Sequence, residues 1–285
     1  MGVFTSDSFL RAYALARGAQ PVYGSQMWIV KRAFVRMAEC SPWNGFIEEV
    51  NPEQSLNVAR HHNAWILNFT SQSIVDDYRF SLLPPSPTFL TFPDFIPSKK
   101  LRWSIKKAST LHATIEPGNW IQLQKPLSRL WERLGRAIPS EFYSILEESG
   151  DGHSTVAKVN GESAAGLFYL VDHDKGRFMY SLATDAKYKG SELTSLLVFS
   201  FLKTAFEEGA PYVDLCGASV PSLYIFKKQF ASTIAWRPRY IGIINPLWHI
   251  ARLKALYLYR DQSAHIPEKE DWREYLVKDL ISAKL

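Results

Sequence analysis

The sequence has few cysteines and no long apolar run. Its 285 residues include only two cysteines, Cys40 and Cys216, which are too far apart for a CxxC pair and too few for a disulfide framework. We therefore expect a reducing compartment and a cytoplasmic location. No window of about 18 uncharged apolar residues exists, so the sequence predicts no membrane-spanning helix.

Several motifs that define large enzyme classes are also missing. There is no Gly-x-Ser-x-Gly elbow, no GxxxxGK[ST] phosphate loop and no GxGxxG dinucleotide fingerprint. The histidines in His61-His62 and in Asp172-His173-Asp174 lack the spacing of zinc ligands, so we expect no metal. A catalytic pair of Cys216 with a histidine stays open, although a cysteine at a strand end is usually a buried packing residue.

What is present points to a folded, moderately basic protein. Hydrophobic residues make up 46% of the chain and aromatic residues 14%, which is too much for a disordered chain. The 33 Lys and Arg exceed the 28 Asp and Glu by five. This modest excess is compatible with phosphates, RNA or anionic lipid as partners and demands none of them.

The hydrophobic pattern predicts helices and strands in mixed order before residue 150. Capping residues and apolar periodicity favour a helix that begins after Ser6 and ends at Gly18, and the proline-rich passage after Leu83 separates two elements. The other expected helices lie at 71–80, 99–108, 126–136 and 140–148, and the expected strands at 26–30, 65–69, 88–92 and 111–115.

After the turn at 149–152 the pattern is more regular. It predicts a three-stranded meander at 155–159, 164–171 and 177–183, then a helix at 191–208, a strand at 212–216, a helix at 221–230 and a strand at 236–244. The turn suggests a domain boundary. We expect a degenerate first half at 1–150, a better-formed second half at 151–245 and a helical tail at 246–285.

Three segments of the second half carry a resemblance to a known fold. They are YSLATDAKYKGSELTSLLVFSFLKTAFEEG at 180–209, YVDLCG at 212–217 and SLYIFKKQFAS at 222–232, and the helix KLRWSIKKA at 100–108 adds a fourth. In this order they resemble the acyltransferase fold shared by GNAT enzymes and the FemABX-like peptidyltransferases. The resemblance implies an α+β fold of two tandem GNAT-like halves, with mixed, largely antiparallel sheets flanked by helices.

The resemblance also implies an activity. It is the transfer of an acyl or aminoacyl group to an acceptor amine, which for this branch includes a cell-envelope precursor. The donor would be acyl-CoA or aminoacyl-tRNA, and no metal is needed. Two alternatives remain: a CoA-dependent acetyltransferase acting on a small amine, and a non-catalytic membrane-surface or RNA-binding protein that retains the fold.

The resemblance places the donor at the start of the long helix, where main-chain N–H groups and the helix dipole favour phosphate. The donor-binding residues that it implies are Lys187, Tyr188, Lys189, Gly190, Ser191, Gly217 and Phe226. Glu192 departs from the family pattern, because a small residue is expected where this carboxylate stands. A carboxylate beside a pyrophosphate is unfavourable, which argues against CoA and for aminoacyl-tRNA. Gly190 can equally be a simple turn glycine.

Lys227 and Asp214 are the candidate catalytic residues. Lys227 shares an apolar helix face with Leu223 and Phe230, so its ammonium must reach water, pair with a carboxylate or meet an anionic ligand. By resemblance it would stabilise the oxyanion of the transferred carbonyl. Asp214 alternates with apolar neighbours on a strand and would orient or deprotonate the amine, or else hold the loop that follows it.

The densest positive cluster is a stripe on the predicted helix 99–108. Lys99, Arg102 and Lys106 recur at helical spacing and could hold an anionic acceptor, or they could be an ordinary solvated face.

The tail at 246–260 has the periodicity of an amphipathic helix with interspersed cations and aromatic rings. This pattern suits peripheral binding to an anionic membrane surface, at the inner face of the membrane, and equally a helix packed on the core of the protein.

Overall fold

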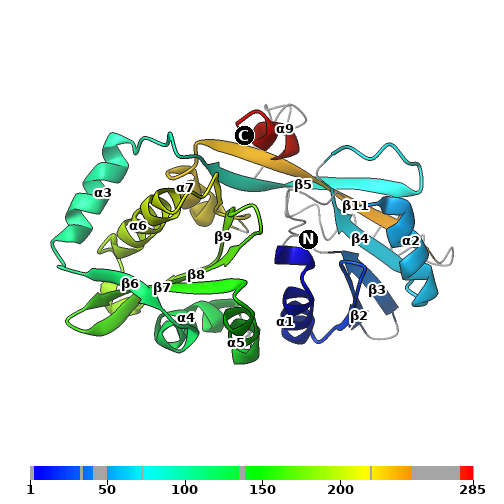
Figure 1. Cartoon of the computed structure of the whole chain (residues 1–285), viewed down its shortest axis with the longest axis horizontal. Helices are drawn as coiled ribbons and strands as arrows, with labels where there is room; N and C mark the ends of the chain where they lie inside the picture. The colour runs from blue at the N-terminus through cyan, green and yellow to red at the C-terminus, as the bar shows by residue number, and fades with distance from the viewer. Residues whose placement is uncertain are drawn as a thin grey trace. The chain divides into compact units, whose positions relative to one another are not determined.

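The computed structural model describes residues 3–32, 35–40, 50–71, 73–134, 139–218, 220–244 and 277–284 (Figure 1). The chain divides into two compact units. Unit 1 consists of Met1–Thr88, Gly217–Tyr224 and Ile234–Leu285, and unit 2 of Phe89–Cys216 and Ile225–Thr233. Each unit contains a mixed, largely antiparallel sheet with helices packed on it, which confirms the expected α+β class.

Unit 1 has the strand order β1-β2-β3-β4-β11-β5. Among the register pairs described for these strands, only β3 and β4 run parallel. The strands are β1 Gln20–Val22, β2 Met27–Arg32, β3 Val35–Cys40, β4 Ile66–Thr70, β11 Thr233–Ile243 and β5 Phe80–Thr91. Its helices are η1 Val3–Thr5, α1 Asp7–Arg17, α2 Pro52–His61 and α9 Val277–Ser282.

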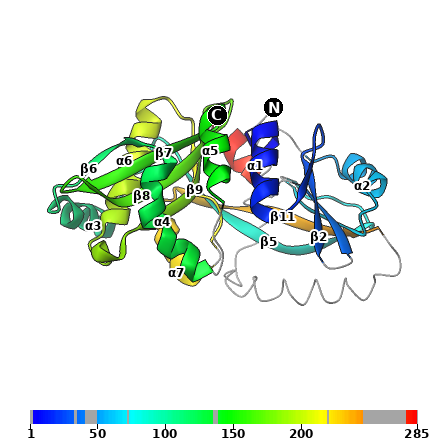
Figure 2. The same cartoon turned by 90° about the horizontal axis from the view of Figure 1, so that it is seen from below.

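The two faces of this sheet bury different helices. Leu56 and Ala59 of α2 join a core with Leu67 and Phe69 of β4, and Leu10 of α1 packs in a separate cluster with strand residues of β2. Figure 2 shows α1 and α2 on either side of β2. As predicted, α1 begins at the cap Ser6 and ends at Gly18, whose φ of 61° favours glycine.

Unit 2 has the strand order β5-β10-β9-β8-β7-β6. Its strands besides β5 are β6 Thr114–Gly118, β7 Gly152–Val159, β8 Glu162–Val171, β9 Arg177–Thr184 and β10 Val213–Asp214. Its helices are α3 Lys99–Ser109, α4 Trp120–Leu134, α5 Ser140–Ser149, η2 Ala186–Tyr188 and α6 Leu193–Glu207, and α7 Pro221–Lys228 continues into it from unit 1. The meander β7-β8-β9 confirms the prediction from the second half.

Helices cover both faces of the unit 2 sheet. On one face, α4 packs on β8 and β9, and α5 packs on β7. On the other face, α6 packs on β7, β8 and β9, and α3 packs against α6. Figure 1 shows α4 and α6 on opposite sides of β8. The α4 contact is close, since any side chain at Gly166 would collide with that of Leu123. The glycine therefore permits the helix to approach the strand.

Some expected elements differ from the structure. The helix predicted at 71–80 is wrong: Asp77 instead accepts hydrogen bonds from the main chain and side chain of Arg79, a local motif that competes with helix formation. The strand at 88–92 begins earlier, at Phe80, and runs through the prolines. The strand expected at 111–115 lies at 114–118. The elements β1, β3 and α2 were not predicted.

The division into units also differs from the expected boundary at residue 150. The elements α3, β6, α4 and α5 belong to unit 2 because their buried faces pack on β7, β8 and α6. The turn at 149–152 therefore joins a helix and a strand of one unit. The expected tail helix at 246–260 lies outside the described residues.

Candidate functional site in unit 2

Lys227 is buried at the end of α7, although its neighbour Lys228 is exposed. Only 6% of the Lys227 surface is accessible, as the apolar helix face predicts. Its Nζ donates a short hydrogen bond of 2.5 Å to the main-chain oxygen of Leu215, directly after β10. The structure thus places a cation at the carboxyl end of that strand.

Burial lowers the pKa of the Lys227 ammonium from its ordinary value, because a charge without water around it is disfavoured. The charges of Cys216 and Asp214 act in the opposite direction and raise it, but by less. A lysine in this position exchanges its proton more readily than an exposed one. It suits either stabilisation of a developing oxyanion or proton transfer.

Asp214 is fully buried at the end of β10. Its Oδ1 accepts a hydrogen bond of 2.6 Å from the main-chain N–H of Cys216, whose φ of 61° lies in the left-handed region. The carboxylate therefore holds the turn after its strand, which was one of the two interpretations of the sequence. It also contributes negative charge near Lys227, so the geometry is compatible with both roles.

The strands β9 and β10 separate after a short contact. They run parallel and pair only at Val213 with Arg177 and at Asp214 with Phe178, whereas β9 continues to Thr184. Among the described strands, none pairs with β9 on its β10 side beyond this point. The main-chain groups of β9 that face the β10 side are therefore left for a ligand or for side chains.

The turn between β9 and α6 contains the predicted donor residues. Tyr188 belongs to η2, Gly190 has a φ of 79°, and the Ser191 hydroxyl donates to the Tyr188 oxygen at 2.6 Å and accepts from the N–H of Leu193 at 3.3 Å. Within the described part of the chain, the main-chain N–H groups of Gly190, Glu192 and Thr194 have no acceptor. N–H groups left open before and at the start of a helix are the kind of donor that anions accept from.

Glu192 occupies the N-cap position of α6, although its side chain accepts no hydrogen bond from a main-chain N–H of the helix. It has a φ of 63°, and its carboxylate Oε2 accepts a hydrogen bond of 3.3 Å from the hydroxyl of Ser195 in the first helical turn. The carboxylate therefore lies at the positive end of the helix dipole, where a phosphate would otherwise be favoured. This arrangement does not suit a pyrophosphate at the same place.

Of the remaining donor candidates, Lys187 and Lys189 belong to the same turn, whereas Phe226 lies on α7 and Gly217 follows β10. Lys187 and Lys189 are exposed, and the Lys187 ammonium lies 5.5 Å from the centre of the Tyr188 ring. The half-buried Phe226 packs its ring 5.2 Å from that of Phe230. Gly217, half-buried, follows Cys216 in the chain and is counted with unit 1.

The last turn of α3 lies beside the turn at 187–191, which we call the donor turn. Lys99, Arg102 and Lys106 are exposed, as is Lys107, whose Nζ donates a hydrogen bond of 3.1 Å to the main-chain oxygen of Gly190. The structure therefore joins the end of α3 to the turn before α6, a relationship that the sequence did not predict because the two segments are 83 residues apart.

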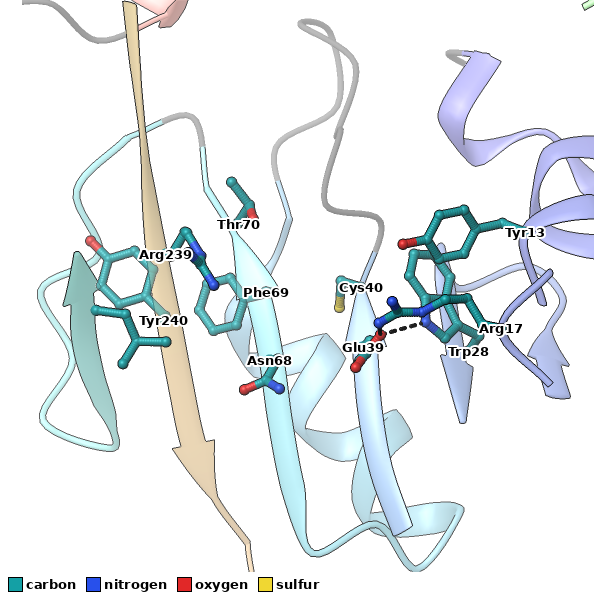
Figure 3. Close-up of a pocket in the computed structure, with 11 residues that line it drawn as sticks. Tyr13, Arg17, Trp28, Glu39, Cys40, Asn68, Phe69, Thr70, Arg239 and Tyr240 are labelled. Atoms are coloured by element: carbon teal, nitrogen blue, oxygen red, sulfur yellow. Dashed lines mark hydrogen bonds and ion pairs between the residues drawn. The ribbon is translucent and has the colours of Figure 1, made fainter. Parts of the chain in front are cut away.

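A cavity of about 140 Å³ lies in unit 1 and was not predicted. Figure 3 shows Glu39 accepting from Arg17 and Trp28, with Asn68, Thr70 and Arg239 on neighbouring strands. The Glu39 Oε2 lies 3.0 Å from Arg17 Nη2 and 2.9 Å from Trp28 Nε1. Asn68 was the one signal of this cavity in the sequence, because asparagine is uncommon in an apolar strand such as β4.

Other candidates have structural partners. Burial raises the pKa of the Cys40 thiol to about 12, so it stays protonated, and it donates a hydrogen bond to Ser55. His173 bonds through its ring to Asp172, and the described residues contain no group of three or more His, Cys, Asp or Glu side chains able to hold a metal ion. Of the helices described, none has the length and apolar character that a bilayer crossing requires.

The site lies within a recognised domain. Residues 126–228 match the family model of an acetyltransferase (GNAT) domain. This range contains Asp214, Lys227 and the donor turn, whereas α3 precedes it. The resemblance seen in the sequence is therefore confirmed for this part of the chain.

Solved structures extend the likeness to most of the chain at the level of the fold. The crystal structure of FemX has a TM-score of 0.64 and 14% identity, and the match covers 84% of this chain and 92% of FemX. The C-terminal domain of a putative lysylphosphatidylglycerol synthetase from Agrobacterium fabrum has a TM-score of 0.59 and 14% identity, with 92% and 97% covered.

A third similar structure is L-PGS from Bacillus licheniformis, with a TM-score of 0.59, 12% identity and 88% and 91% of the two chains covered. A search of curated protein sequences finds no significant match. The structures together establish a FemX-like GNAT fold.

Proposed function

We propose that the chain is an acyltransferase that moves an aminoacyl group from an activated donor to an acceptor amine. The observation that carries this proposal is the buried Lys227 at the carboxyl end of β10, with Asp214 beside it, inside the region that matches a GNAT domain. A desolvated cation at a strand end is where an oxyanion of acyl transfer would be stabilised.

The reaction forms one bond and breaks one. The nitrogen of the acceptor amine attacks the donor carbonyl carbon, and the negative charge that develops on the carbonyl oxygen is stabilised by Lys227. Asp214 orients the amine. When the tetrahedral intermediate collapses, the bond from carbon to the leaving oxygen or sulfur breaks, and the leaving group takes up the proton that the amine has lost.

For the donor, we infer aminoacyl-tRNA rather than acyl-CoA. Lys187, Lys189 and the open N–H groups near Gly190 favour phosphate, but the Glu192 carboxylate at the start of α6 disfavours a compact pyrophosphate there. In an RNA donor the phosphates are spaced singly along the nucleic-acid backbone, so no pyrophosphate has to lie beside the Glu192 carboxylate. The synthetases of similar fold are named for a lysyl group on a phospholipid, which also suggests an aminoacyl donor.

For the acceptor, we infer a cell-envelope precursor. This inference depends on FemX and the lysylphosphatidylglycerol synthetase as neighbours in fold. A cytoplasmic location with peripheral attachment at the inner face of a membrane, through 246–260, would bring the chain to such an acceptor and stays a prediction.

Binding of the donor is the first test. We expect aminoacyl-tRNA to raise the melting temperature of the full chain and acetyl-CoA to leave it unchanged, since a ligand stabilises the state that it binds. Transfer is then measured as the loss of radiolabelled amino acid from the RNA into an extract of envelope precursors. Lys227→Met should abolish this loss, and the matched Lys228→Met should not.

Other outcomes distinguish the alternatives. Stabilisation and turnover with acetyl-CoA alone would establish a CoA-dependent acetyltransferase, which the description of the matching family model favours. Stabilisation by neither donor would contradict an enzyme and favour a non-catalytic protein that retains the fold.

A further inference from the structure

The exposed face of α3 is strongly and uniformly basic. The helix carries five cations and no acidic residue: Lys99, Lys100, Arg102, Lys106 and Lys107, all exposed. Trp103 lies among them with 60% of its surface accessible, and the Lys107 ammonium is 5.4 Å from the centre of a Trp103 ring. The face therefore holds one exposed aromatic ring among its cations.

The opposite face of the same helix is buried. Leu101, Ser104 and Ala108 are buried, and α3 packs against α6. The exposed face therefore offers cations and one aromatic ring, but no apolar stripe.

The basic face continues into the donor turn. Lys107 donates to the main-chain oxygen of Gly190, and Lys187 and Lys189 are exposed on the same turn. We define the α3 basic surface as the five cations of the helix with Trp103 and these two lysines. An eleven-residue helix is about 16 Å long, which exceeds the size of one phosphate group or one pyrophosphate.

We propose that the α3 basic surface binds the sugar-phosphate backbone of an RNA, with Trp103 stacking on an unpaired base. The proposal rests on the proposed function, because it makes this surface the part of the donor site that holds the RNA. It differs from the prediction that Lys99, Arg102 and Lys106 hold an anionic acceptor, since the Lys107 bond attaches the helix to the donor turn. A row of cations with an aromatic platform is the usual composition of single-stranded nucleic-acid sites.

A membrane surface is the competing partner of the same charge, and the packing of α3 disfavours it. A helix that binds a lipid surface inserts its apolar face, and here that face is buried on α6. Trp103 alone would remain to insert.

The test measures RNA binding by the full chain without turnover. The probe is bulk deacylated transfer RNA, titrated at several salt concentrations. The variant combines Lys99→Ala, Arg102→Ala and Lys106→Ala, and the matched control combines Lys31→Ala, Lys175→Ala and Lys203→Ala, which removes three exposed cations elsewhere. We expect the first variant to weaken binding at least about tenfold and to reduce the salt slope by about 2, and the control to do neither.

Trp103→Ala separates stacking from charge. We expect it to weaken binding of RNA about tenfold with little change in the salt slope, because it removes no cation. Trp103→Phe, which keeps a ring, should recover much of the affinity. Both variants are checked for an unchanged melting temperature, which the exposure of Trp103 predicts.

Each result bears on a separate claim. Equal RNA affinity in the α3 variant and its control overturns the α3 basic surface, whether or not the chain transfers aminoacyl groups. Binding to vesicles of equal phosphatidylglycerol and phosphatidylcholine that depends on α3, with no binding of RNA, overturns it in favour of a membrane. RNA binding that depends on α3 without any transfer activity keeps the surface and contradicts the proposed function.

Discussion

The ammonium group of Lys227 donates a hydrogen bond to the main-chain oxygen of Leu215, and both residues are buried. The residue before Leu215 in the chain, Asp214, accepts from the N–H of the residue after it, Cys216. The side chains of Lys227 and Asp214 thus hold the main chain at Leu215 and Cys216, directly after β10. The cation is held in one place relative to the strand, and a preorganised charge of this kind stabilises a transition state without a cost of reorganisation.

Replacing Lys227 should abolish transfer while preserving the fold. In Lys227→Met the oxygen of Leu215 loses its donor, which costs about 1–3 kcal/mol, but a buried charge disappears at the same time. We therefore expect the free energy of unfolding to change by no more than about 2 kcal/mol and the rate of transfer to fall at least about 100-fold. Urea denaturation and single-turnover transfer measure the two effects. A variant that does not fold would make Lys227 structural.

The stability difference between the wild type and Lys227→Met should depend on pH. Burial lowers the pKa of Lys227 in the folded state, so protonation favours the unfolded chain. The wild type therefore gains stability relative to the variant as pH rises from the lowered pKa toward the unfolded value of 10.5, and loses it again as pH falls. Denaturation curves of both proteins across this range test the sign. A difference independent of pH would contradict a lowered pKa.

Asp214 can be tested for its two roles with two substitutions. Asp214→Asn keeps an oxygen that accepts from the N–H of Cys216, so stability should change by less than about 1 kcal/mol, whereas Asp214→Ala leaves that buried N–H unpaired and should cost about 1–3 kcal/mol. The loss of negative charge should lower the pKa of Lys227 further. We expect both variants to transfer more slowly than the wild type, and the residual activity of Asp214→Asn to have its alkaline limb at lower pH. Full activity in Asp214→Asn would restrict the carboxylate to the turn.

Much of unit 2 could be predicted because its signals are local. The meander has turn residues and alternating strands, α6 has an apolar stripe, and the buried position of Lys227 follows from helical spacing on α7. The open N–H groups near Gly190 follow from its place before a helix. Each of these elements can therefore be predicted from the residues within and directly beside it.

The relationships across long separations could not be predicted in this way. The bond from Lys107 to Gly190 depends on how α3 packs on α6, and the cavity in unit 1 depends on the parallel pairing that sets Glu39 of β3 opposite Asn68 of β4. The strand β3 itself carries Arg36 and Glu39 between its apolar residues, so its pattern is weak. The left-handed conformation of Glu192 could not be predicted either, because glutamate has no intrinsic preference for it.

The cavity in unit 1 leads to a prediction about stability. Trp28 is buried, and its indole N–H has the Glu39 carboxylate as its acceptor. Glu39→Ala should leave this N–H without a partner and cost about 1–3 kcal/mol in the free energy of unfolding. Glu39→Gln keeps an oxygen for Trp28 and should cost clearly less. Equal losses in the two variants would show that the charge facing Arg17 matters more than the hydrogen bond.

Glu192 should determine which donors the chain accepts. Glu192→Gln removes the charge at the start of α6 and keeps the side chain, and Glu192→Gly in addition relieves the left-handed backbone. We expect both variants to bind acetyl-CoA at least about tenfold more tightly than the wild type, because repulsion of the pyrophosphate is gone. Isothermal titration calorimetry measures the affinity, with Glu207→Gln at the other end of α6 as the matched control. If acetyl-CoA binds the variants and the wild type equally weakly, the carboxylate is not the group that excludes CoA, and the shape of the separated β9 and β10 becomes the reason to test next.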